Sequence, residues 1–278
     1  MFATRFAPSP SGYLHRGHAF SALTAHAAAR AADGRFVLRI EDIDATRCRP
    51  EYEDAIYEDL AWLGLEWETP VRRQSDHLDD YQDALARLEA DGLLYRCFRT
   101  RKEVAEEIAR APHGAMEVFR GGPLAPEDEA RRLAAGEPYA WRLSLAAAQA
   151  RLGGFGDLTF VEEGSDEPHL VQARPELGGD VVLARKDVGV AYHLAVVVDD
   201  ALQGVTHVIR GEDLAEATHV QRLLQALLGL PTPVYRHHRL LTGPDGRRFA
   251  KRDRAETLRD LRARGVTAQD LRRELGFD

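Results

Sequence analysis

The first third of the chain alternates between hydrophobic and polar positions in a way that predicts a strand, a helix and a second strand. A short alternating run at residues 3–6 leads into a loop rich in proline and glycine. An alanine-rich segment then predicts a helix from about residue 17 to 32, and residues 35–44 alternate as a strand does. This order predicts a βαβ unit with parallel strands and a right-handed crossover.

Two more helices and an interrupted region come next. Helical spacing at residues 51–64 and 77–92 predicts helices that pack on the sheet, and Gly64 and Gly92 are expected to end them. From about residue 93 to 185, prolines and glycines interrupt the short apolar patterns. Such a stretch is typical of an inserted domain with many loops.

The α/β pattern resumes after the interrupted region. We interpret the apolar run AVVVDD at residues 195–200 as a buried strand and residues 205–213 as a second strand. Residues 218–231 predict an amphipathic helix that ends at a glycine and a proline. A hairpin-like stretch at residues 239–253 and a charged helical region complete the expected order.

The composition is that of an ordinary globular protein, since 44% of the 278 residues are hydrophobic and 29% are charged. No apolar run reaches the roughly 18 residues of a membrane span, and the N-terminus lacks the pattern of a secretory signal. We therefore expect a cytoplasmic protein without a membrane partner. The net charge of −8 argues against a protein that coats nucleic acid indiscriminately, although the segment after Arg239 is basic.

The segment after the first strand carries the pattern His-x-Gly-His, with His15, Gly17 and His18 at the start of the predicted helix. A helix N-terminus presents backbone N–H groups and the positive end of the helix dipole, and a glycine lets a ligand approach closely. The pattern therefore predicts a phosphate site. The alternative is a proline-rich connection with two incidental surface histidines.

A second basic motif is GRRFAKRD at residues 246–253, which contains Lys251 among arginines. A fixed ammonium group there is expected to neutralise a triphosphate while its α-phosphate is attacked, because such charges are a main source of rate enhancement. The alternative is a charged face in contact with solvent.

Two further groups of candidate site residues lie at or near the other predicted strands. One group is acidic, and the other could bind a carboxylate. Glu41, Asp42 and Asp44 come after the second strand, at the sheet edge where α/β proteins bind ligands. These carboxylates are candidates for an ammonium group or a magnesium ion, and the alternative is helix capping and surface solvation. Tyr192 and Arg210 lie beside the later strands, where an arginine suits bidentate capture of a substrate carboxylate.

In this order, the stretches RFAPSPSGYLHRGH, RIEDID, YHLAVVVDD, VIRGEDL and FAKRD resemble the catalytic core of class I aminoacyl-tRNA synthetases of the glutamyl type. The resemblance implies an α/β fold in which a Rossmann-like catalytic domain is split by an acceptor-binding-type insertion and followed by a short C-terminal helical stem-contact region. The expected boundaries are 1–92 and 186–238 for the catalytic halves, 93–185 for the insertion and 239–278 for the signature loop and C-terminal helices.

The resemblance also assigns two sets of site residues. Glutamate is expected to contact Arg5, Phe6, Ala7, Pro8, Ser9, Glu41, Tyr192 and Arg210, with Arg5 on a carboxylate and Glu41 on the ammonium group. ATP, with Mg²⁺ on its phosphates, is expected to contact His15, Gly17, His18 and Lys251, of which the histidines and the lysine are the catalytic candidates. The positive charge of the tail, rather than the resemblance, makes Arg247, Arg248, Arg252 and Arg254 candidates for RNA backbone contacts, and the alternative is a helical face in contact with solvent.

The chain ends soon after Lys251, where a full glutamyl-tRNA synthetase continues into an anticodon-binding domain, so we expect no anticodon reader. The chain is therefore identified as a member of the shorter glutamyl-queuosine tRNA(Asp) synthetase family. That family attaches glutamate to the queuosine base in the anticodon loop of tRNA(Asp). The implied partners are tRNA(Asp) carrying queuosine, L-glutamate and ATP, with no obligate protein partner.

The sequence departs from the family pattern in two places. The zinc site of many members uses a Cys-x-Cys pair, a tyrosine and a further cysteine, whereas here Cys97 lacks its companion and the other cysteine is Cys48. We therefore expect no zinc and an insertion held by ordinary packing. The second family signature is degenerate, since it keeps only Lys251 in kind. Two alternatives stay open, a catalytically silent tRNA-binding paralogue and a small-molecule nucleotidyltransferase.

Overall fold

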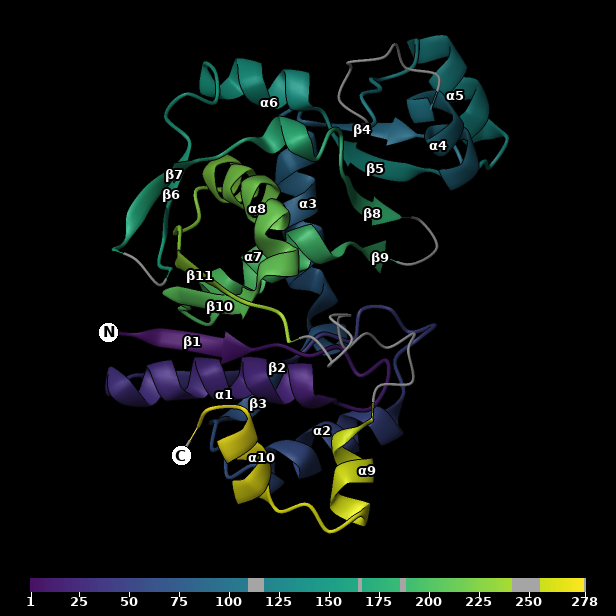
Figure 1. Cartoon of the computed structure of the whole chain (residues 1–278). Coiled ribbons are helices and arrows are strands. Elements are labelled where there is room, and N and C mark those ends of the chain that lie inside the picture. Colours follow the sequence, from purple (N-terminus) through teal and green to yellow (C-terminus); the bar gives the residue numbers. More distant parts are fainter. Residues whose placement is uncertain (110–117, 165–166, 186–188, 242–255, 278) are drawn as a thin grey trace.

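The computed structural model describes residues 1–109, 118–164, 167–185, 189–241 and 256–277 (Figure 1). The first part forms β1 (Ala3–Phe6), α1 (Arg16–Ala31), β2 (Arg35–Ile40), α2 (Pro50–Trp62), β3 (Glu68–Arg73), η1 (Gln74–His77) and α3 (Leu78–Ala90). The middle part forms β4 (Leu94–Cys97), α4 (Arg101–Ala109), α5 (Pro126–Ala134), β5 (Ala140–Leu143), α6 (Leu145–Leu152), β6 (Thr159–Glu162), β7 (His169–Gln172), η2 (Pro175–Leu177) and β8 (Val182–Arg185). The last part forms β9 (Gly189–Val190), α7 (Tyr192–Leu202), β10 (His207–Gly211), η3 (Glu212–Leu214), α8 (Ala215–Leu228), β11 (Val234–His238), α9 (Leu258–Ala263) and α10 (Ala268–Glu274).

The central layer consists of parallel strands. β1, β2 and β3 pair in that order, and β10 pairs in parallel with β11. β1 lies beside β10, and the Thr206 N–H just before β10 donates to the Ala3 carbonyl at 2.9 Å. The predicted βαβ unit is therefore confirmed as β1, α1 and β2. The later strand at 205–213 is confirmed as β10.

The predicted helices are confirmed as α1, α2, α3 and α8. Gly64 and Gly92 follow the last turns of α2 and α3 with φ values of +74° and +70°, and Gly229 follows α8 with φ +65°. A left-handed residue directly after a helix suits glycine because it carries no Cβ. The glycines expected to end α2 and α3 therefore do so.

The interpretation of AVVVDD as a buried strand is wrong, because these residues form the middle of helix α7. Residues 194–200 of this helix are all buried. A helix that is covered on every side has no polar face, so it lacks the spacing that separates helices from strands. The same burial places Asp199 and Asp200 inside the protein, where both bind arginines.

The central strands separate two hydrophobic cores. Adjacent residues of β10 point to opposite sides, so that Val208 packs with α3, α7 and α8 whereas Ile209 packs with α1, α2, α9 and α10. Figure 1 shows α1, α2, α9 and α10 on one side of the central strands and α7 and α8 on the other. The core around Val208 continues through Leu143 and Phe160 into the region predicted as an insertion.

The interrupted region contains mainly antiparallel strands. β4, β5, β8 and β9 form one sheet, while the hairpin of β6 and β7 joins the central layer because β6 pairs with β11. Asp180 ties the first sheet together, because one of its oxygens accepts from the Tyr95 hydroxyl at 2.8 Å and from the Gly121 N–H at 2.9 Å. Beside it, Tyr95, Cys97 and Phe119 form a small separate core. The expected domain boundaries stay predictions.

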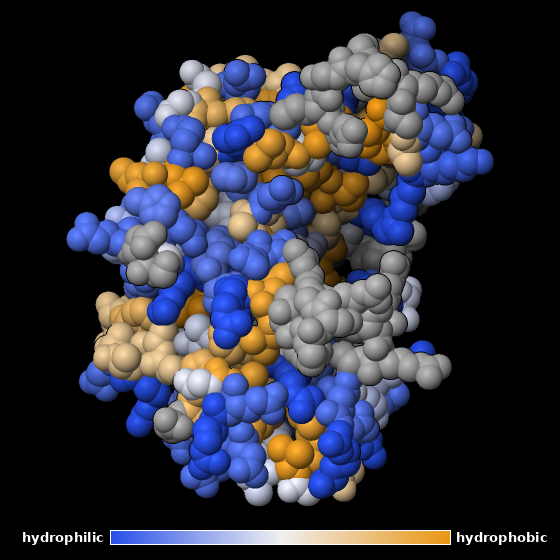
Figure 2. All heavy atoms as spheres, viewed as in Figure 1, coloured by the Kyte–Doolittle hydropathy of each residue, from blue (hydrophilic) through white to orange (hydrophobic). Residues whose placement is uncertain are grey.

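The C-terminal helices return to the start of α1. The Leu258 N–H donates to the Leu14 carbonyl at 2.8 Å, and Arg16 forms ion pairs with Glu256 at 2.8 Å and Glu274 at 2.9 Å. Hydrophilic residues cover most of the face that Figure 2 shows, including these helices. Across the described ranges, no helix is long and apolar enough to cross a membrane.

Candidate active site

A cavity of about 630 Å³ opens at the carboxyl ends of the central strands. Its walls are the loop after β1, the start of α1, the residue after β2, the end of β10 and the segment after β11. The volume lies within the range of small-molecule and cofactor sites. Parallel strands bring their carboxyl ends to one sheet edge, which is why segments far apart in sequence meet here.

Every predicted glutamate- or ATP-binding residue that the structure describes lines this cavity: Arg5, Phe6, Ala7, Pro8, Ser9, His15, Gly17, His18, Glu41, Tyr192 and Arg210. The predicted residues Lys251, Arg247, Arg248, Arg252 and Arg254 lie outside the described residues. The individual role of each residue stays a prediction.

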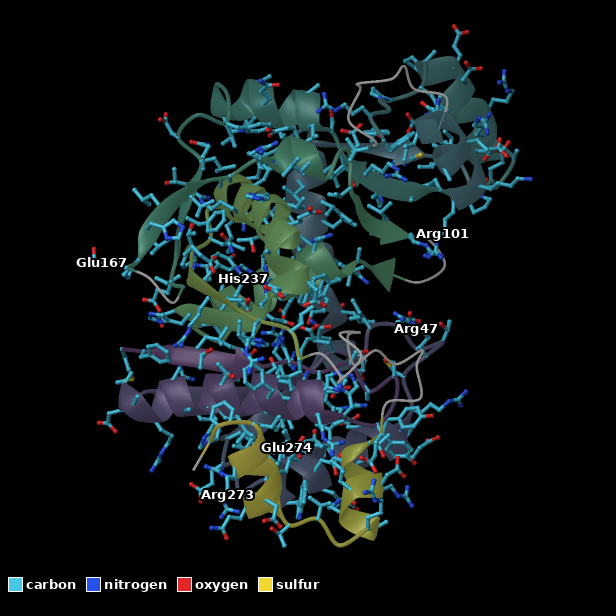
Figure 3. The ribbon with its side chains drawn as sticks, in the orientation of Figure 1. Arg47, Arg101, Glu167, His237, Arg273 and Glu274 are labelled. Carbon is cyan, nitrogen blue, oxygen red and sulfur yellow. The ribbon has the colours of Figure 1, made fainter. Side chains whose placement is uncertain are left out.

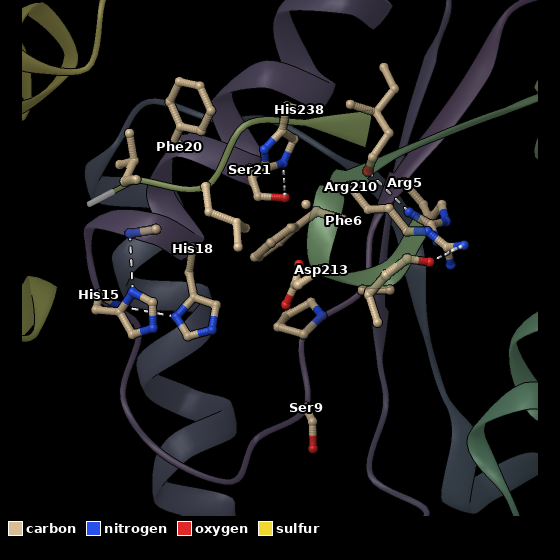
Figure 4. Close-up of a pocket in the computed structure, with 18 of the residues that line it drawn as sticks. Arg5, Phe6, Ser9, His15, His18, Phe20, Ser21, Arg210, Asp213 and His238 are labelled. Atoms are coloured by element: carbon tan, nitrogen blue, oxygen red, sulfur yellow. Dashed lines mark hydrogen bonds between the residues drawn. The ribbon is translucent and has the colours of Figure 1, made fainter. Parts of the chain in front are cut away.

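The two histidines of the His-x-Gly-His motif cap helix α1 (Figure 4). The Gly17 N–H donates to Nδ1 of His15 at 3.1 Å, and the His15 N–H donates to Nδ1 of His18 at 3.2 Å. Because each Nδ1 accepts, the ring hydrogen of each neutral imidazole is on Nε2. A Cβ on residue 17 would lie 2.9 Å from the His15 ring, so any larger residue would force that ring to shift.

Arg5 and Glu41 belong to one buried charge network. Asp200 accepts from Nε of Arg5 at 3.2 Å and from Nη1 of Arg39 at 2.8 Å, and Nη2 of Arg39 donates to Glu41 at 3.1 Å. Burial acts to raise the pKa of Asp200, but the charges of Arg5 and Arg39 outweigh it and lower that pKa. Burial raises the pKa of Glu41, and the two arginines oppose the shift only in part. A cation that binds beside such a buried carboxylate stabilises its charged form.

Arg210 forms the other cationic wall of the cavity. Its Nη2 donates to Thr218 Oγ1 at 2.7 Å and to the Leu214 carbonyl at 3.2 Å. Its Nη1 lies 3.4 Å from the Tyr192 hydroxyl, and its Nε lies 3.3 Å from Nε2 of His237. The guanidinium is thus held from behind, with Nη1 at the side of Tyr192, which lines the cavity.

The other two acidic residues after β2 serve the local structure. The Asp42 carboxylate accepts from the backbone N–H and hydroxyl of Ser75 at 2.8 and 2.6 Å. The Asp44 carboxylate accepts from Thr46 Oγ1 at 2.5 Å and from Arg47 Nε at 2.6 Å. Glu41 is therefore the member of this acidic cluster that lines the cavity, and Asp44 stabilises a local turn.

Sequence reasoning missed several residues of the cavity wall: Phe20, Ser21, Ile209, Gly211, Asp213, Leu214, His238, Arg239, Leu240 and Leu241. Most lie at the end of β10 or β11 or directly after it, and the rule that ligands bind at the carboxyl ends of parallel strands points to them. Phe20 and Ser21 lie one turn into α1, on the side that carries the histidines. His238 Nε2 and Ser21 Oγ are 3.1 Å apart and connect these two walls (Figure 4).

In the part of the chain that the structure describes, no group of three or more His, Cys, Asp or Glu residues is arranged to hold a metal ion. Cys97 is buried in the small core with Tyr95 and Phe119. Among the described residues that line the cavity, two carry carboxylates, Glu41 and Asp213.

The family model for the catalytic domain of class I tRNA synthetases (E and Q) matches residues 1–276. A glutamyl-Q tRNA(Asp) synthetase of Rhodobacter capsulatus is 48% identical over 283 residues, which cover 99% of each chain. A protein of the same name from Symbiobacterium thermophilum is 42% identical over 100% of this chain and 86% of its own.

A solved glutamate tRNA ligase from Elizabethkingia meningosepticum, in complex with its amino acid, matches with a TM-score of 0.71 at 27% identity. The match covers 91% of this chain and 52% of the ligase, so the chain spans about half the length of that structure. The expected fold class is therefore confirmed. The chain belongs to the family of class I tRNA synthetases of the glutamate and glutamine type, and its sequence groups it with the glutamyl-Q tRNA(Asp) synthetases.

Proposed function

We propose that this protein activates L-glutamate with ATP and transfers it to the queuosine base in the anticodon loop of tRNA(Asp). The observation that carries the proposal is the meeting of three features in one cavity. A capped helix start, a buried carboxylate and two anchored arginines all line it. These features suit a nucleotide phosphate, an ammonium group and two carboxylates, which together describe glutamate beside ATP. The relative from Rhodobacter capsulatus, which is named glutamyl-Q tRNA(Asp) synthetase and aligns over 99% of both chains, supports the choice of acceptor.

The first step is attack of the glutamate α-carboxylate on the α-phosphate of ATP, which forms glutamyl-adenylate and releases pyrophosphate. Negative charge builds on the phosphoryl oxygens during this step. His15 and His18 are proposed to donate from Nε2, because each Nδ1 already accepts a hydrogen bond, and the N-terminus of α1 would add its dipole. Glu41 is proposed to bind the substrate ammonium group, with Arg5 and Arg210 on its carboxylates.

Magnesium is proposed to enter with the nucleotide. The described cavity wall offers Glu41 and Asp213 as its carboxylates, and Glu41 is already engaged by Arg39. Such a wall fits an ion that keeps most of its ligands from phosphate oxygens and water. Bound magnesium would neutralise phosphate charge, while the protein residues position the glutamate carboxylate for attack.

In the second step a hydroxyl of the queuosine cyclopentenediol attacks the activated carbonyl, and AMP leaves. The glutamate side chain stays fixed by the arginines while the RNA delivers the nucleophile. Arg247, Arg248, Arg252 and Arg254 are proposed to contact the RNA backbone, because they are close in sequence to the proposed ATP lysine and carry positive charge.

The deciding experiment is incubation of the protein with ATP, labelled glutamate and tRNA(Asp) that either contains or lacks queuosine. We expect label that requires the modified base and resists mild deacylation of the tRNA 3′ end. Label on the 3′ end would contradict the proposed acceptor. RNA binding without formation of glutamyl-adenylate would favour a silent paralogue. The absence of ATP–pyrophosphate exchange with every amino acid tested would favour a nucleotidyltransferase.

The proposed role of Lys251 has its own test. Lys251→Ala should lower the rate of glutamate-dependent ATP–pyrophosphate exchange by about 10²- to 10³-fold, the loss seen when a fixed donor to a developing oxyanion is removed. Lys102, on the exposed face of α4, offers the matched control, and Lys102→Ala should exchange as the unaltered protein does. Equal rates for the two variants would remove Lys251 from the proposed mechanism.

A further inference from the structure

We propose that His237 and Glu162 are positioning residues that orient Arg210 for the substrate carboxylate, an inference that rests on the proposed glutamate site. Neither residue lines the cavity, and both lie behind Arg210. His237 is near the end of β11, in the interior of the molecule (Figure 3). Glu162 is the last residue of β6, which comes from the region predicted as an insertion.

The contacts form a continuous chain from Glu162 to the cavity. The Glu162 carboxylate accepts from the His237 backbone N–H at 2.9 Å and lies 2.9 Å from Nδ1 of the same residue. On the other side of the ring, Nε2 lies 3.2 Å from Thr218 Oγ1 and 3.3 Å from Nε of Arg210. Arg210 then reaches Tyr192 at the cavity wall.

The hydrogen positions in this chain follow from the chemistry of its ends. Arg210 only donates, and a carboxylate only accepts, so Nε2 of His237 must accept and Nδ1 must carry the hydrogen that Glu162 receives. Thr218 Oγ1 accepts from Nη2 of Arg210 and can turn its own hydrogen toward Nε2. With Nδ1–H on His237, every member of the chain is satisfied.

The opposite tautomer would place an N–H of His237 against the N–H of Arg210. The guanidinium would then lose an acceptor and meet a donor, so it would turn away from its present position. Glu162 prevents this by binding the hydrogen on Nδ1, in the way that a second residue selects the tautomer of a ligand-binding histidine. The side chains of His237 and Glu162 are only 9% and 16% exposed, so water competes little for these bonds.

This arrangement predicts a specific kinetic effect of changes at His237. His237→Leu removes the acceptor behind Arg210 and should raise KM for glutamate about 10- to 100-fold, the factor that matches loss of a hydrogen bond to a charged group. KM for ATP should stay within about twofold, because the chain reaches only the carboxylate site. His237→Gln returns an acceptor at the position of Nε2 and should recover most of the affinity.

Changes at Glu162 should repeat the pattern more weakly. Glu162→Ala frees the tautomer and should raise KM for glutamate about tenfold, whereas Glu162→Gln still offers an acceptor oxygen to Nδ1–H and should lie near the unaltered protein. His219 provides the matched control, because its Nδ1 accepts from the Arg174 N–H at 3.2 Å on the same face of the sheet without joining the chain. His219→Gln should leave both KM values unchanged.

The experiment measures ATP–pyrophosphate exchange with full-length variants whose folding is checked by thermal unfolding, and ¹⁵N NMR reads the His237 tautomer. Raised KM for glutamate alone, with recovery in His237→Gln, supports the inference. Unchanged KM in a folded His237→Leu protein, or equal rises for glutamate and ATP, would overturn it.

If the unaltered protein shows no ATP–pyrophosphate exchange with glutamate, the proposed function fails. The tautomer of His237, read by ¹⁵N NMR, then tests the chain of contacts from Glu162 to Arg210 independently of activity. Nδ1–H in the unaltered protein that is lost in Glu162→Ala supports the chain. Nε2–H in the unaltered protein overturns it.

Discussion

At one side of the cavity His15 and His18 are held by hydrogen bonds between residues two or three positions apart, while at the other side Arg5 is held by Asp200, 195 positions away. The two hydrogen bonds of the first arrangement form within one helix start. The second needs the complete fold, because Asp200 must arrive on α7 after the interrupted region has been crossed. We therefore expect the histidine side to tolerate change better than the arginine side.

The largest effect should come from Asp200, which serves Arg5 and Arg39 together. Asp200→Ala leaves two arginines without their shared carboxylate in the interior, so it should lower the free energy of unfolding by about 3 to 5 kcal/mol. Chemical unfolding measures this. Asp44→Ala, at a local turn after β2, should cost far less, and equal losses would end the distinction between the two sides.

Asp59 is a second buried aspartate that can be compared with Asp200. Asp59 has one arginine beside it, Arg262 at 2.8 Å, whereas Asp200 has two. Burial raises the pKa of Asp59 to about 6, and the charge of Arg262 opposes the shift only in part. A raised carboxyl pKa means that the folded state binds the proton more tightly, so this contribution to stability is lost as pH rises through 6.

Asp59→Asn removes that titration. Between pH 5 and pH 8 the stability of Asp59→Asn relative to the unaltered protein should therefore improve by about 1 to 2 kcal/mol. Unfolding in urea at both pH values provides the measurement. A stability difference that is the same at pH 5 and pH 8 would contradict the assigned ionisation of Asp59.

His15 tests the local side of the cavity. His15→Ala removes the cap of α1 and should lower the free energy of unfolding by about 1 kcal/mol. His15→Asn restores a capping acceptor but lacks the ring Nε2–H, so it should recover stability while exchange stays slow. Recovery of both properties by asparagine would mean that His15 only caps the helix.

The smallest effect should come from the pair of Arg35 and Glu68, which joins β2 to β3 at the surface with both side chains about 40% exposed. Glu68→Ala should change the free energy of unfolding by less than about 0.5 kcal/mol, because solvent screens such pairs. This variant separates the effect of burial from the effect of sequence distance. A loss as large as that of Asp200→Ala would show that burial is not what sets the difference.

Much of the fold and cavity was accessible from the sequence where the signal is local. The helix at α1, the glycines after α2 and α3, and the strand at β2 each follow from spacing within about one turn or strand. The described residues that the family resemblance assigns to glutamate or ATP also line one cavity, as expected. Helix α7 was misread because complete burial removes the polar face that marks a helix.

The residues that hold the arginines of the cavity could not be predicted from the sequence in the same way. His237 lies in none of the family stretches, and Asp200 ends one of them without an assigned role. The role of each depends on an arginine that only the tertiary fold brings within 3.3 Å. A buried aspartate pair at the end of an apolar run was the available signal for Asp199 and Asp200. Charged residues are rarely buried without partners, so that pair could have been matched to the arginines of β1 and β2.

The histidine cap of α1 has a consequence for how an anion enters. The imidazoles of His15 and His18 accept from the backbone N–H groups of Gly17 and His15, so the motif caps its own helix. An anion that bound at the Gly17 N–H would exchange one acceptor for another and would free the His15 ring to turn toward it. The helix start would then keep the same number of backbone hydrogen bonds with either partner, so binding and release would not require α1 to unwind.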